Sequence, residues 1–188
     1  MLVSTKDMLE KAHAEGYAIP SPDYVDSNSV RAFAQVAEEL RAPLILSFAE
    51  VHLEQMSVEE AALLGTYYAR TTDAPIALHL DHGVHLDVIE ESIRQGFTSV
   101  MIDASSEELD ENIRRTKEVV ELAHAHGVTV EAEIGHVGTE EEGNPHALSD
   151  NVYTEVAAAR ALVEATGVDS LAVSVGTKHG SYKGEPHI

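Results

Sequence analysis

The segment PIALHLDHG, residues 75–83, carries an apolar run that ends in two ionisable residues. Pro75 opens the run, and Asp81, His82 and Gly83 close it. A short, nearly continuous apolar run between turn-forming residues is typical of a β-strand buried on both faces. Adjacent strand residues point to opposite faces, so Asp81 and His82 can act together only if the strand is already ending there. Gly83 is consistent with a turn at that point.

Similar runs alternate with helical segments along the whole chain. This alternation predicts a parallel sheet, either an open doubly wound sheet or a (β/α)8 barrel. No Gly-x-Gly-x-x-Gly follows the first expected strand, which counts against a dinucleotide-binding fold. We expect strands at 17–19, 44–48, 76–80, 99–102, 128–134 and 171–175. We expect helices at 5–15, from a cap at Asn28 or Ser29 to about 41, from a capping box at Ser57 to about 70, and at 86–95, 107–126 and 154–166.

The expected fold class is α/β, a (β/α)8 TIM barrel that stops after about six strands. A closed barrel of this type needs eight strands and typically about 250 residues, whereas the chain has 188. We therefore expect residues 1–188 to form one barrel domain whose C-terminal quarter is missing. The one long irregular stretch, residues 135–151, is rich in Gly and Glu, and such a loop usually has a function.

The composition excludes several classes of protein. A net charge of −21, from 33 acidic and 12 basic side chains, should repel nucleic acid and anionic membranes. A site for a phosphorylated substrate must then be local, built from backbone N–H groups and a few cations. Cysteine is absent, which excludes disulfides, thiolate metal sites and a cysteine nucleophile. No signal peptide opens the chain and no apolar run approaches the roughly 20 residues of a membrane span, so we expect a cytoplasmic protein.

Ionisable residues recur where the expected strands end. In parallel α/β folds that edge binds ligands, and His with Asp or Glu is a ligand set for a divalent metal. Taken singly, each residue has a simpler reading: a lone His is often a hydrogen-bonded loop residue, and Asp103 could cap toward Ser105 and Ser106. The set as a whole favours a metal site, and its members are Asp81, His82, Asp103, Glu133 and His179.

Around these residues the chain resembles the class II, zinc-dependent aldolases that act on fructose and tagatose bisphosphates. The resemblance runs along nearly the whole chain, and several long motifs occur in the right order. The most specific motifs are HLDHG (79–83), SVMIDAS (99–105), VEAEIG (130–135), GTKHG (176–180) and YKGEP (182–186).

The resemblance implies a reaction and a role for each residue. It implies reversible cleavage of a ketose 1,6-bisphosphate to dihydroxyacetone phosphate and glyceraldehyde 3-phosphate, with zinc stabilising the enediolate. It also implies homodimers or homotetramers. The implied roles are zinc ligation for His82 and His179, proton exchange with the aldehyde-derived oxygen for Asp81, a second cation site for Asp103 and Glu133, proton abstraction from the ketone for Glu141, and backbone contact with the ketone phosphate and a monovalent cation for Gly180.

The sequence also departs from the family pattern. Pro22-Asp23 stands where the family usually has Phe-Asn, so Asp23 takes the position of a substrate-contacting asparagine. The segment 47–50, SFAE, differs from the common Ser-Glu-Gly type, although Ser47 can still face the site. The loop carries Gly138-Thr139 in place of Gly-Gly, and the chain ends at Ile188, before the third zinc histidine of the family.

Three alternatives to a zinc aldolase stay open. A non-catalytic, aldolase-like barrel could act as a binding or partner subunit. A different metal-dependent lyase or hydrolase could use the same barrel. Lysine Schiff-base chemistry is weakly supported, because Lys178 is the only lysine near a strand end.

Overall fold

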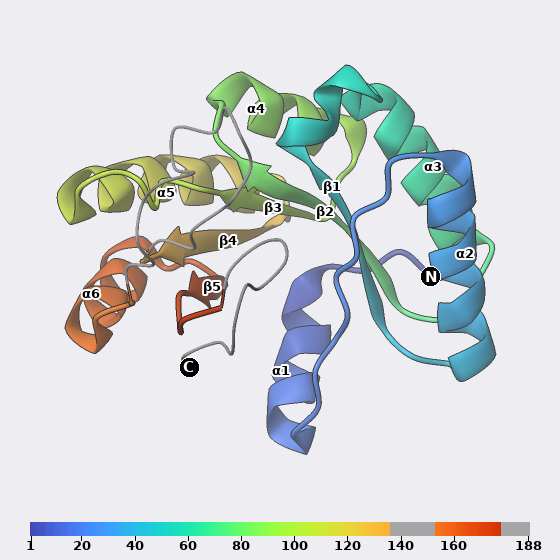
Figure 1. The fold of residues 1–188 in the computed structure, drawn as a ribbon, viewed down its shortest axis with the longest axis horizontal. Helices are drawn as coiled ribbons and strands as arrows, with labels where there is room; N and C mark the ends of the chain where they lie inside the picture. The colour runs from blue at the N-terminus through green and yellow to red at the C-terminus, as the bar shows by residue number, and fades with distance from the viewer. Residues whose placement is uncertain (136–152, 178–188) are drawn as a thin grey trace.

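The computed structural model describes residues 1–135 and 153–177. Helices and strands alternate along nearly all of this chain, with one short 3₁₀ helix (Figure 1). The elements are α1 (Thr5–Glu15), α2 (Ser27–Leu40), β1 (Leu44–Ala49), η1 (Glu50–Glu54), α3 (Val58–Arg70), β2 (Ile76–Gly83), α4 (Leu86–Gln95), β3 (Ser99–Ile102), α5 (Leu109–His124), β4 (Thr129–Ile134), α6 (Val156–Thr166) and β5 (Ser170–Val173).

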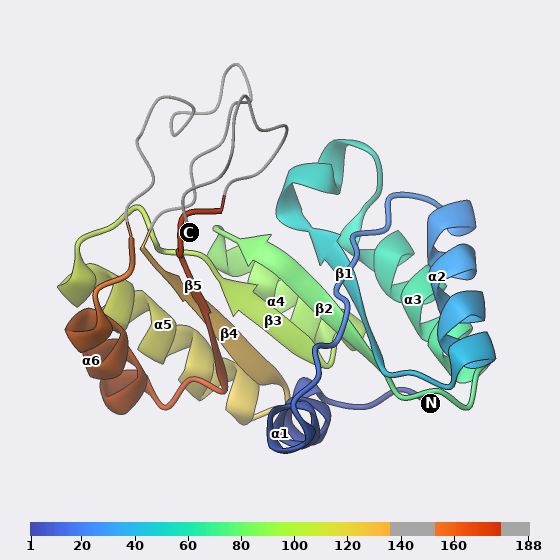
Figure 2. The same ribbon diagram turned by 60° about the horizontal axis from the view of Figure 1, so that its bottom comes forward.

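The five strands of the described residues form one parallel sheet in the order β1-β2-β3-β4-β5. A doubly wound sheet reverses its strand order at a switch point, and here the order follows the chain throughout. Helices α2 to α6 lie along one face of the sheet (Figures 1 and 2). The predicted fold class, a parallel α/β sheet of the (β/α)8 barrel type, is confirmed.

The two faces of the sheet are buried against different partners. Side chains such as Leu46, Leu78 and Val130 point toward the helices and belong to the main core. The opposite face, here called the inner face, carries Ile45 and Ala77, which pack against Met8 of α1. Burial on both faces explains why β1 and the first part of β2 read as continuous apolar runs, whereas β5 is only partly buried in the described residues.

Helix α1 covers the inner face near the amino-terminal ends of the strands. The Thr5 hydroxyl is hydrogen-bonded to the hydroxyl of Thr129, the first residue of β4, at 2.6 Å. In Figure 2 this helix lies at the end of the sheet away from the strand arrowheads. Helix α1 therefore does not cover the carboxyl ends of the strands, which are here called the rim.

The strand expected at 17–19 is wrong. Those residues are irregular, and the following segment, 20–24, runs beside β1 instead. Ile45 donates to the Pro20 carbonyl (3.0 Å), Ser47 donates to the Pro22 carbonyl (3.2 Å), and Tyr24 donates to the Ser47 carbonyl (2.9 Å). Pro22 has no N–H to donate to the Ile45 carbonyl, so the parallel ladder along β1 lacks that one bond.

The start of α2 also differs from the expectation. Asp26, rather than Asn28 or Ser29, is the N-cap, and its carboxylate accepts from the N–H groups of Asn28 (2.9 Å) and Ser29 (2.7 Å). The sequence contains several good capping residues in a row, and a carboxylate placed two and three residues before these N–H groups satisfies both. At α3 the expected cap is present, since the Ser57 hydroxyl accepts from Glu60 N–H at 3.1 Å.

Strand β2 contains a β-bulge at Asp81 and His82. Leu80 pairs with Val100 and Gly83 pairs with Ile102, so two residues of β2 lie opposite one residue of β3. His82 has a φ of 46°, in the left-handed region. Contrary to expectation, the strand does not end at Asp81 but continues to Gly83. The extra residue restores the alternation after His82, so Asp81 and His82 both face the inner side.

Gly83 keeps the bulge in place because it leaves room for the neighbouring strand. A Cβ atom at this position would lie 2.5 Å from the Met101 carbonyl oxygen and 2.9 Å from Ile89 Cγ1. We therefore expect Gly83→Ala to lower the free energy of unfolding by about 1–3 kcal/mol, because a backbone carbonyl has to move. Denaturant unfolding of the whole protein measures this change.

Gly16→Ala is the comparison for Gly83→Ala. Gly16 has a φ of 73° and nothing within 4 Å of its virtual Cβ, so alanine there costs about 1–2 kcal/mol of backbone strain without touching the sheet. Both variants should be less stable, but only Gly83→Ala should also impair metal binding at His82. Unchanged stability of Gly83→Ala would show that the turn tolerates a side chain.

No helix in the part of the chain that the structure describes is long and apolar enough to cross a membrane.

Candidate active site

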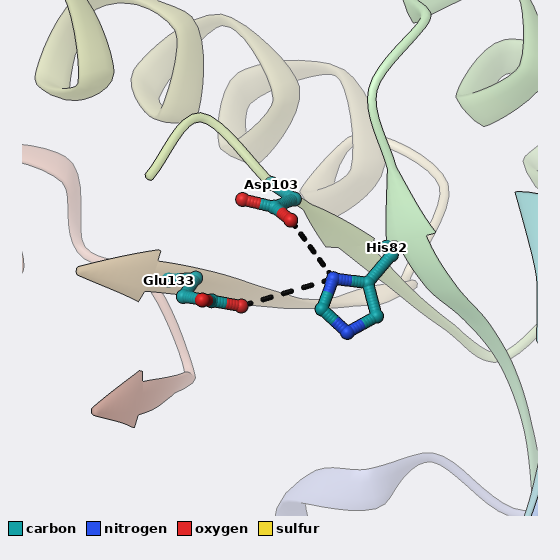
Figure 3. A group of neighbouring side chains, drawn as sticks. All are labelled: His82, Asp103 and Glu133. Atoms are coloured by element: carbon teal, nitrogen blue, oxygen red, sulfur yellow. Dashed lines mark hydrogen bonds and ion pairs between the residues drawn. The ribbon is translucent and has the colours of Figure 1, made fainter. Parts of the chain in front are cut away.

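Three ionisable side chains from neighbouring strands converge at the rim (Figure 3). His82 comes from the bulge of β2, Asp103 directly follows β3, and Glu133 lies near the end of β4. His82 Nδ1 is 2.8 Å from Asp103 Oδ2 and 3.8 Å from Glu133 Oε2. One ligand atom from each residue lies within 4.8 Å of the other two, so the three could hold a metal ion.

The charges of this cluster favour a cation. The hydrogen bond to Asp103 raises the pKa of His82 to about 9, despite its partial burial. Burial raises the pKa of Glu133 to about 7, and the nearby Asp103 adds to this effect. The imidazolium therefore offsets only part of the negative charge of the two carboxylates. A divalent cation fits this donor set and would replace the proton on His82, so its affinity should rise with pH.

Asp103 holds its place through hydrogen bonds on both carboxylate oxygens. Oδ2 is bonded to His82, and Oδ1 accepts from the N–H (3.0 Å) and hydroxyl (2.7 Å) of Ser105. Burial alone would raise the pKa of Asp103, but the hydrogen bonds from His82 and Ser105 lower it to about 2. Asp103 therefore accepts from Ser105, as a capping residue would, and also contacts His82, so its carboxylate is oriented from two sides.

Asp81 lies beside His82 on the inner face. Its Oδ2 is 3.9 Å from His82 Nε2, and its Oδ1 is 3.9 Å from Nε2 of His79, which is buried below it. The side chain of Asp81 is 27% exposed, so it is open to the site. A carboxyl group next to a candidate metal ligand, but with an accessible edge, is suited to proton transfer with a bound molecule.

Sequence reasoning missed His79 and Glu131, which lie on the inner face below the cluster. His79 Nδ1 is hydrogen-bonded to Ser99 at 2.8 Å, and its Nε2 is 3.8 Å from Glu131 Oε2. Burial lowers the pKa of His79 to about 4 and raises that of Glu131 to about 7. The available signal was the two-residue period of a strand, because His79 precedes Asp81 by two and Glu131 precedes Glu133 by two.

Sequence reasoning also missed Glu50, which holds the turn after the bulge. Its side chain, 10% exposed, accepts from the N–H groups of Val84 (2.7 Å) and His85 (3.1 Å) and is bonded to the His85 ring. Arg115 donates to the Val84 carbonyl from the other side. The turn next to His82 is therefore fixed to both η1 and α5. Glu50 is 34 positions from Val84 and 35 positions from His85 in the chain, so no local sequence pattern reveals these contacts.

Asp23 and Ser47 lie side by side on the inner face of the sheet, at the level of His79. The two residues form an isolated bridge, and the buried Ser47 hydroxyl is bonded to the hydroxyl of Ser21 at 2.7 Å. Asp23 Oδ2 lies 3.8 Å from Nε2 of His52, which packs on Phe48. Burial and the nearby Asp81 raise the pKa of Asp23 to about 6. Asp23 thus belongs to the same group of charges as Asp81 and His82.

The remaining predicted site residues, Glu141, His179 and Gly180, lie outside the residues that the structure describes. Their roles stay predictions. So does the role of Lys178.

Comparison with known proteins identifies one family. The family model described as "Fructose-bisphosphate aldolase class-II" matches residues 3–188. A fructose-bisphosphate aldolase from Thermus caldophilus is 42% identical over 187 residues, which cover 98% of this chain and 60% of that protein. The chain therefore spans about three-fifths of the length of this curated relative.

Solved structures agree with this comparison. The YdjI aldolase from Escherichia coli K12 superposes with a TM-score of 0.88 at 32% identity, over 100% of this chain and 66% of that one. A fructose-bisphosphate aldolase from Campylobacter jejuni gives a TM-score of 0.80, over 98% of this chain and 61% of that one. At 24% identity, the second likeness supports the fold alone.

Proposed function

We propose that the whole protein reversibly cleaves a ketose 1,6-bisphosphate, because the chain belongs to the class II fructose-bisphosphate aldolase family. The products are dihydroxyacetone phosphate and glyceraldehyde 3-phosphate, and the sugar is of the fructose or tagatose type. Such an enzyme is a lyase of carbohydrate metabolism, expected in the cytoplasm as a homodimer or homotetramer.

One observation carries this proposal: the bulge in β2 turns Asp81 and His82 to the same face of the sheet. In a regular strand one of these side chains would point into the helix-facing core. Here a candidate metal ligand and a candidate proton-transfer group lie together, with two further carboxylates beside them. Aldol chemistry needs this pairing of charge stabilisation with proton transfer.

Catalytic zinc would be held by His82, His179 and a third histidine from the length of the relatives that this chain does not span. Zinc bound by neutral imidazoles supplies a Lewis acid that stabilises the negative charge of an enediolate, a contribution of several kcal/mol. Asp103 orients the His82 ring through the 2.8 Å hydrogen bond to Nδ1. Asp103 and Glu133 also form the candidate site for a second cation.

Two carboxyl groups would move the protons. In the cleavage direction Asp81 accepts the proton of the substrate hydroxyl that becomes the aldehyde oxygen. Glu141 gives a proton to the carbon of the enediolate in the cleavage direction, and in the reverse direction it abstracts that proton from dihydroxyacetone phosphate. Asp23 and Ser47 contact the substrate from the β1 side of the rim, and the backbone at Gly180 approaches the ketone phosphate.

Metal removal from the purified whole protein tests the proposal. We expect dihydroxyacetone phosphate to form from fructose 1,6-bisphosphate or tagatose 1,6-bisphosphate, as measured by coupled reduction of the product. Activity should be lost after treatment with a chelator and return with added zinc or cobalt. Cleavage that survives complete metal removal would contradict the proposal. Absence of cleavage by the zinc-loaded protein would favour a non-catalytic, aldolase-like subunit.

A further inference from the structure

Asp23 places a second carboxylate beside the proposed proton-transfer group. The main chain at Asp23 is fixed to β1 by the bridge to Ser47 and by the hydrogen bonds on either side of it. Its side chain is 36% exposed, which leaves the carboxylate accessible from the rim. Ser47 lies two residues after Ile45 of the inner face, and paired residues of parallel strands share a face, so Asp23 lies on the inner side of the sheet.

The contact of the Asp23 carboxylate with His52 is too weak to give this side chain a role in stabilising the fold. The distance from Oδ2 to Nε2 is 3.8 Å, longer than a hydrogen bond, and both side chains are partly exposed. Ion pairs of this kind contribute little to stability. The carboxylate is, moreover, partly desolvated next to another acid, Asp81. A charge kept in an unfavourable position, with no partner closer than 3.8 Å among residues 1–135 and 153–177, is a candidate for a functional role.

The position of Asp23 points to the aldehyde half of the substrate. Asp23 pairs with Ser47 of β1, and Ser47 pairs with His79 of β2. The His79 ring lies 3.9 Å from Asp81 Oδ1. Asp81 is the group proposed to exchange a proton with the aldehyde-derived oxygen, and burial together with the charge of Asp81 raises the pKa of Asp23.

We propose that Asp23 sets the choice of aldehyde, and that it extends the substrate class from phosphorylated aldehydes to neutral hydroxyaldehydes. The inference rests on the proposed aldolase function. A carboxylate only accepts hydrogen bonds, so it can bind a hydroxyl group of the aldehyde but not the oxygens of a phosphate. It also repels a phosphate dianion, whereas a neutral side chain of the same shape does not. The reverse reaction then forms a ketose 1-phosphate from dihydroxyacetone phosphate and a neutral aldehyde.

Asp23→Asn in the whole protein tests the inference, because asparagine keeps the shape of the side chain and removes its charge. Aldol addition is measured with dihydroxyacetone phosphate and either glyceraldehyde 3-phosphate or glyceraldehyde, at saturating zinc. The quantity of interest is the ratio of kcat/KM for the phosphorylated aldehyde to kcat/KM for the neutral one. We expect the substitution to raise this ratio about tenfold, the effect of removing one charge that faces a dianion at close range.

Two further variants separate charge from other effects. Asp23→Ser removes the charge without adding an amide donor, so it should also raise the ratio. Asp7→Asn makes the same change in net charge on the exposed side of α1, near the amino-terminal ends of the strands, and should leave the ratio unchanged. Thermal unfolding of each variant shows whether it is folded.

An unchanged ratio in both folded Asp23 variants, with measurable activity, would overturn the inference and leave the aldolase function intact. A ratio that rises equally in Asp7→Asn would overturn it as well, because net charge alone would then explain the effect. If the zinc-loaded wild-type protein makes no product with either aldehyde, the proposed function itself fails, and the inference fails with it.

Discussion

Replacement of His82 by alanine is expected to lower kcat/KM for ketose bisphosphate cleavage by about a thousandfold or more. Among the described residues, His82 is the proposed ligand of the catalytic zinc, and its ring is hydrogen-bonded to Asp103 at 2.8 Å. Without the imidazole, the carboxylates Asp103 and Glu133 lose the positive group beside them. Zinc content, measured on the purified whole protein by atomic absorption, should fall together with activity.

His13→Ala is the control for this loss. His13 is exposed in the last turn of α1, near the amino-terminal ends of the strands, so its removal should change neither zinc content nor rate. A His82→Ala protein that retains full activity would refute the proposed role of this residue. Retained zinc with lost activity would instead indicate that the histidine positions the substrate and does not bind the catalytic metal.

Asp81→Asn should lower kcat by about a hundredfold to ten-thousandfold while zinc content stays normal. Asparagine has the shape of aspartate but cannot take up the proton of the substrate hydroxyl. Because Asp81 lies 3.9 Å from His82, beyond hydrogen-bonding distance, the change should not release the metal. Steady-state kinetics together with metal analysis therefore distinguish this variant from His82→Ala.

Asp7→Asn serves again as the matched control, since it also converts an aspartate into an asparagine but lies on the exposed side of α1. A loss of zinc in Asp81→Asn would mean that the carboxylate contributes to the metal site. A kcat within the range of the wild-type protein would exclude Asp81 as the proton-transfer group and direct attention to His79 or Glu131, which lie below it.

Strands buried on both faces were predictable because their sequence leaves few alternatives. Residues 99–102 form β3 as expected, and the expected strands at 44–48, 128–134 and 171–175 match β1, β4 and β5 to within two residues at each end. The expected strand at 76–80 begins with β2 but ends three residues before it. Polar residues at the ends of such runs must lie on one edge of a parallel sheet. For this reason the meeting of His82, Asp103 and Glu133 could be expected before any coordinates were known.

The details that shape the site depend on contacts across the sheet. The bulge at Asp81 and His82 is defined by the register between β2 and β3, and the close approach of the Met101 carbonyl to Gly83 is not encoded next to Gly83. The pairing of 20–24 with β1 was hidden by its prolines, which usually mark a break in a strand. Glu50 binds the turn after β2 from η1, a short 3₁₀ helix without a recognisable pattern.

Asp23 illustrates how a departure from a pattern gains meaning from structure. The sequence shows only that an aspartate replaces a family asparagine. The coordinates add that this carboxylate is partly buried beside Asp81 and 3.8 Å from His52. On an exposed surface, aspartate in place of asparagine would have little effect. Here it adds a negative charge near the rim, where it can affect the choice of substrate.

Diffraction from crystals of the whole protein, recorded on either side of the zinc absorption edge, locates the metal without reference to activity. We predict an anomalous peak at the rim in contact with the imidazoles of both His82 and His179. A zinc ion bound elsewhere, or two imidazoles too far apart to share one ion, would contradict the proposed active site.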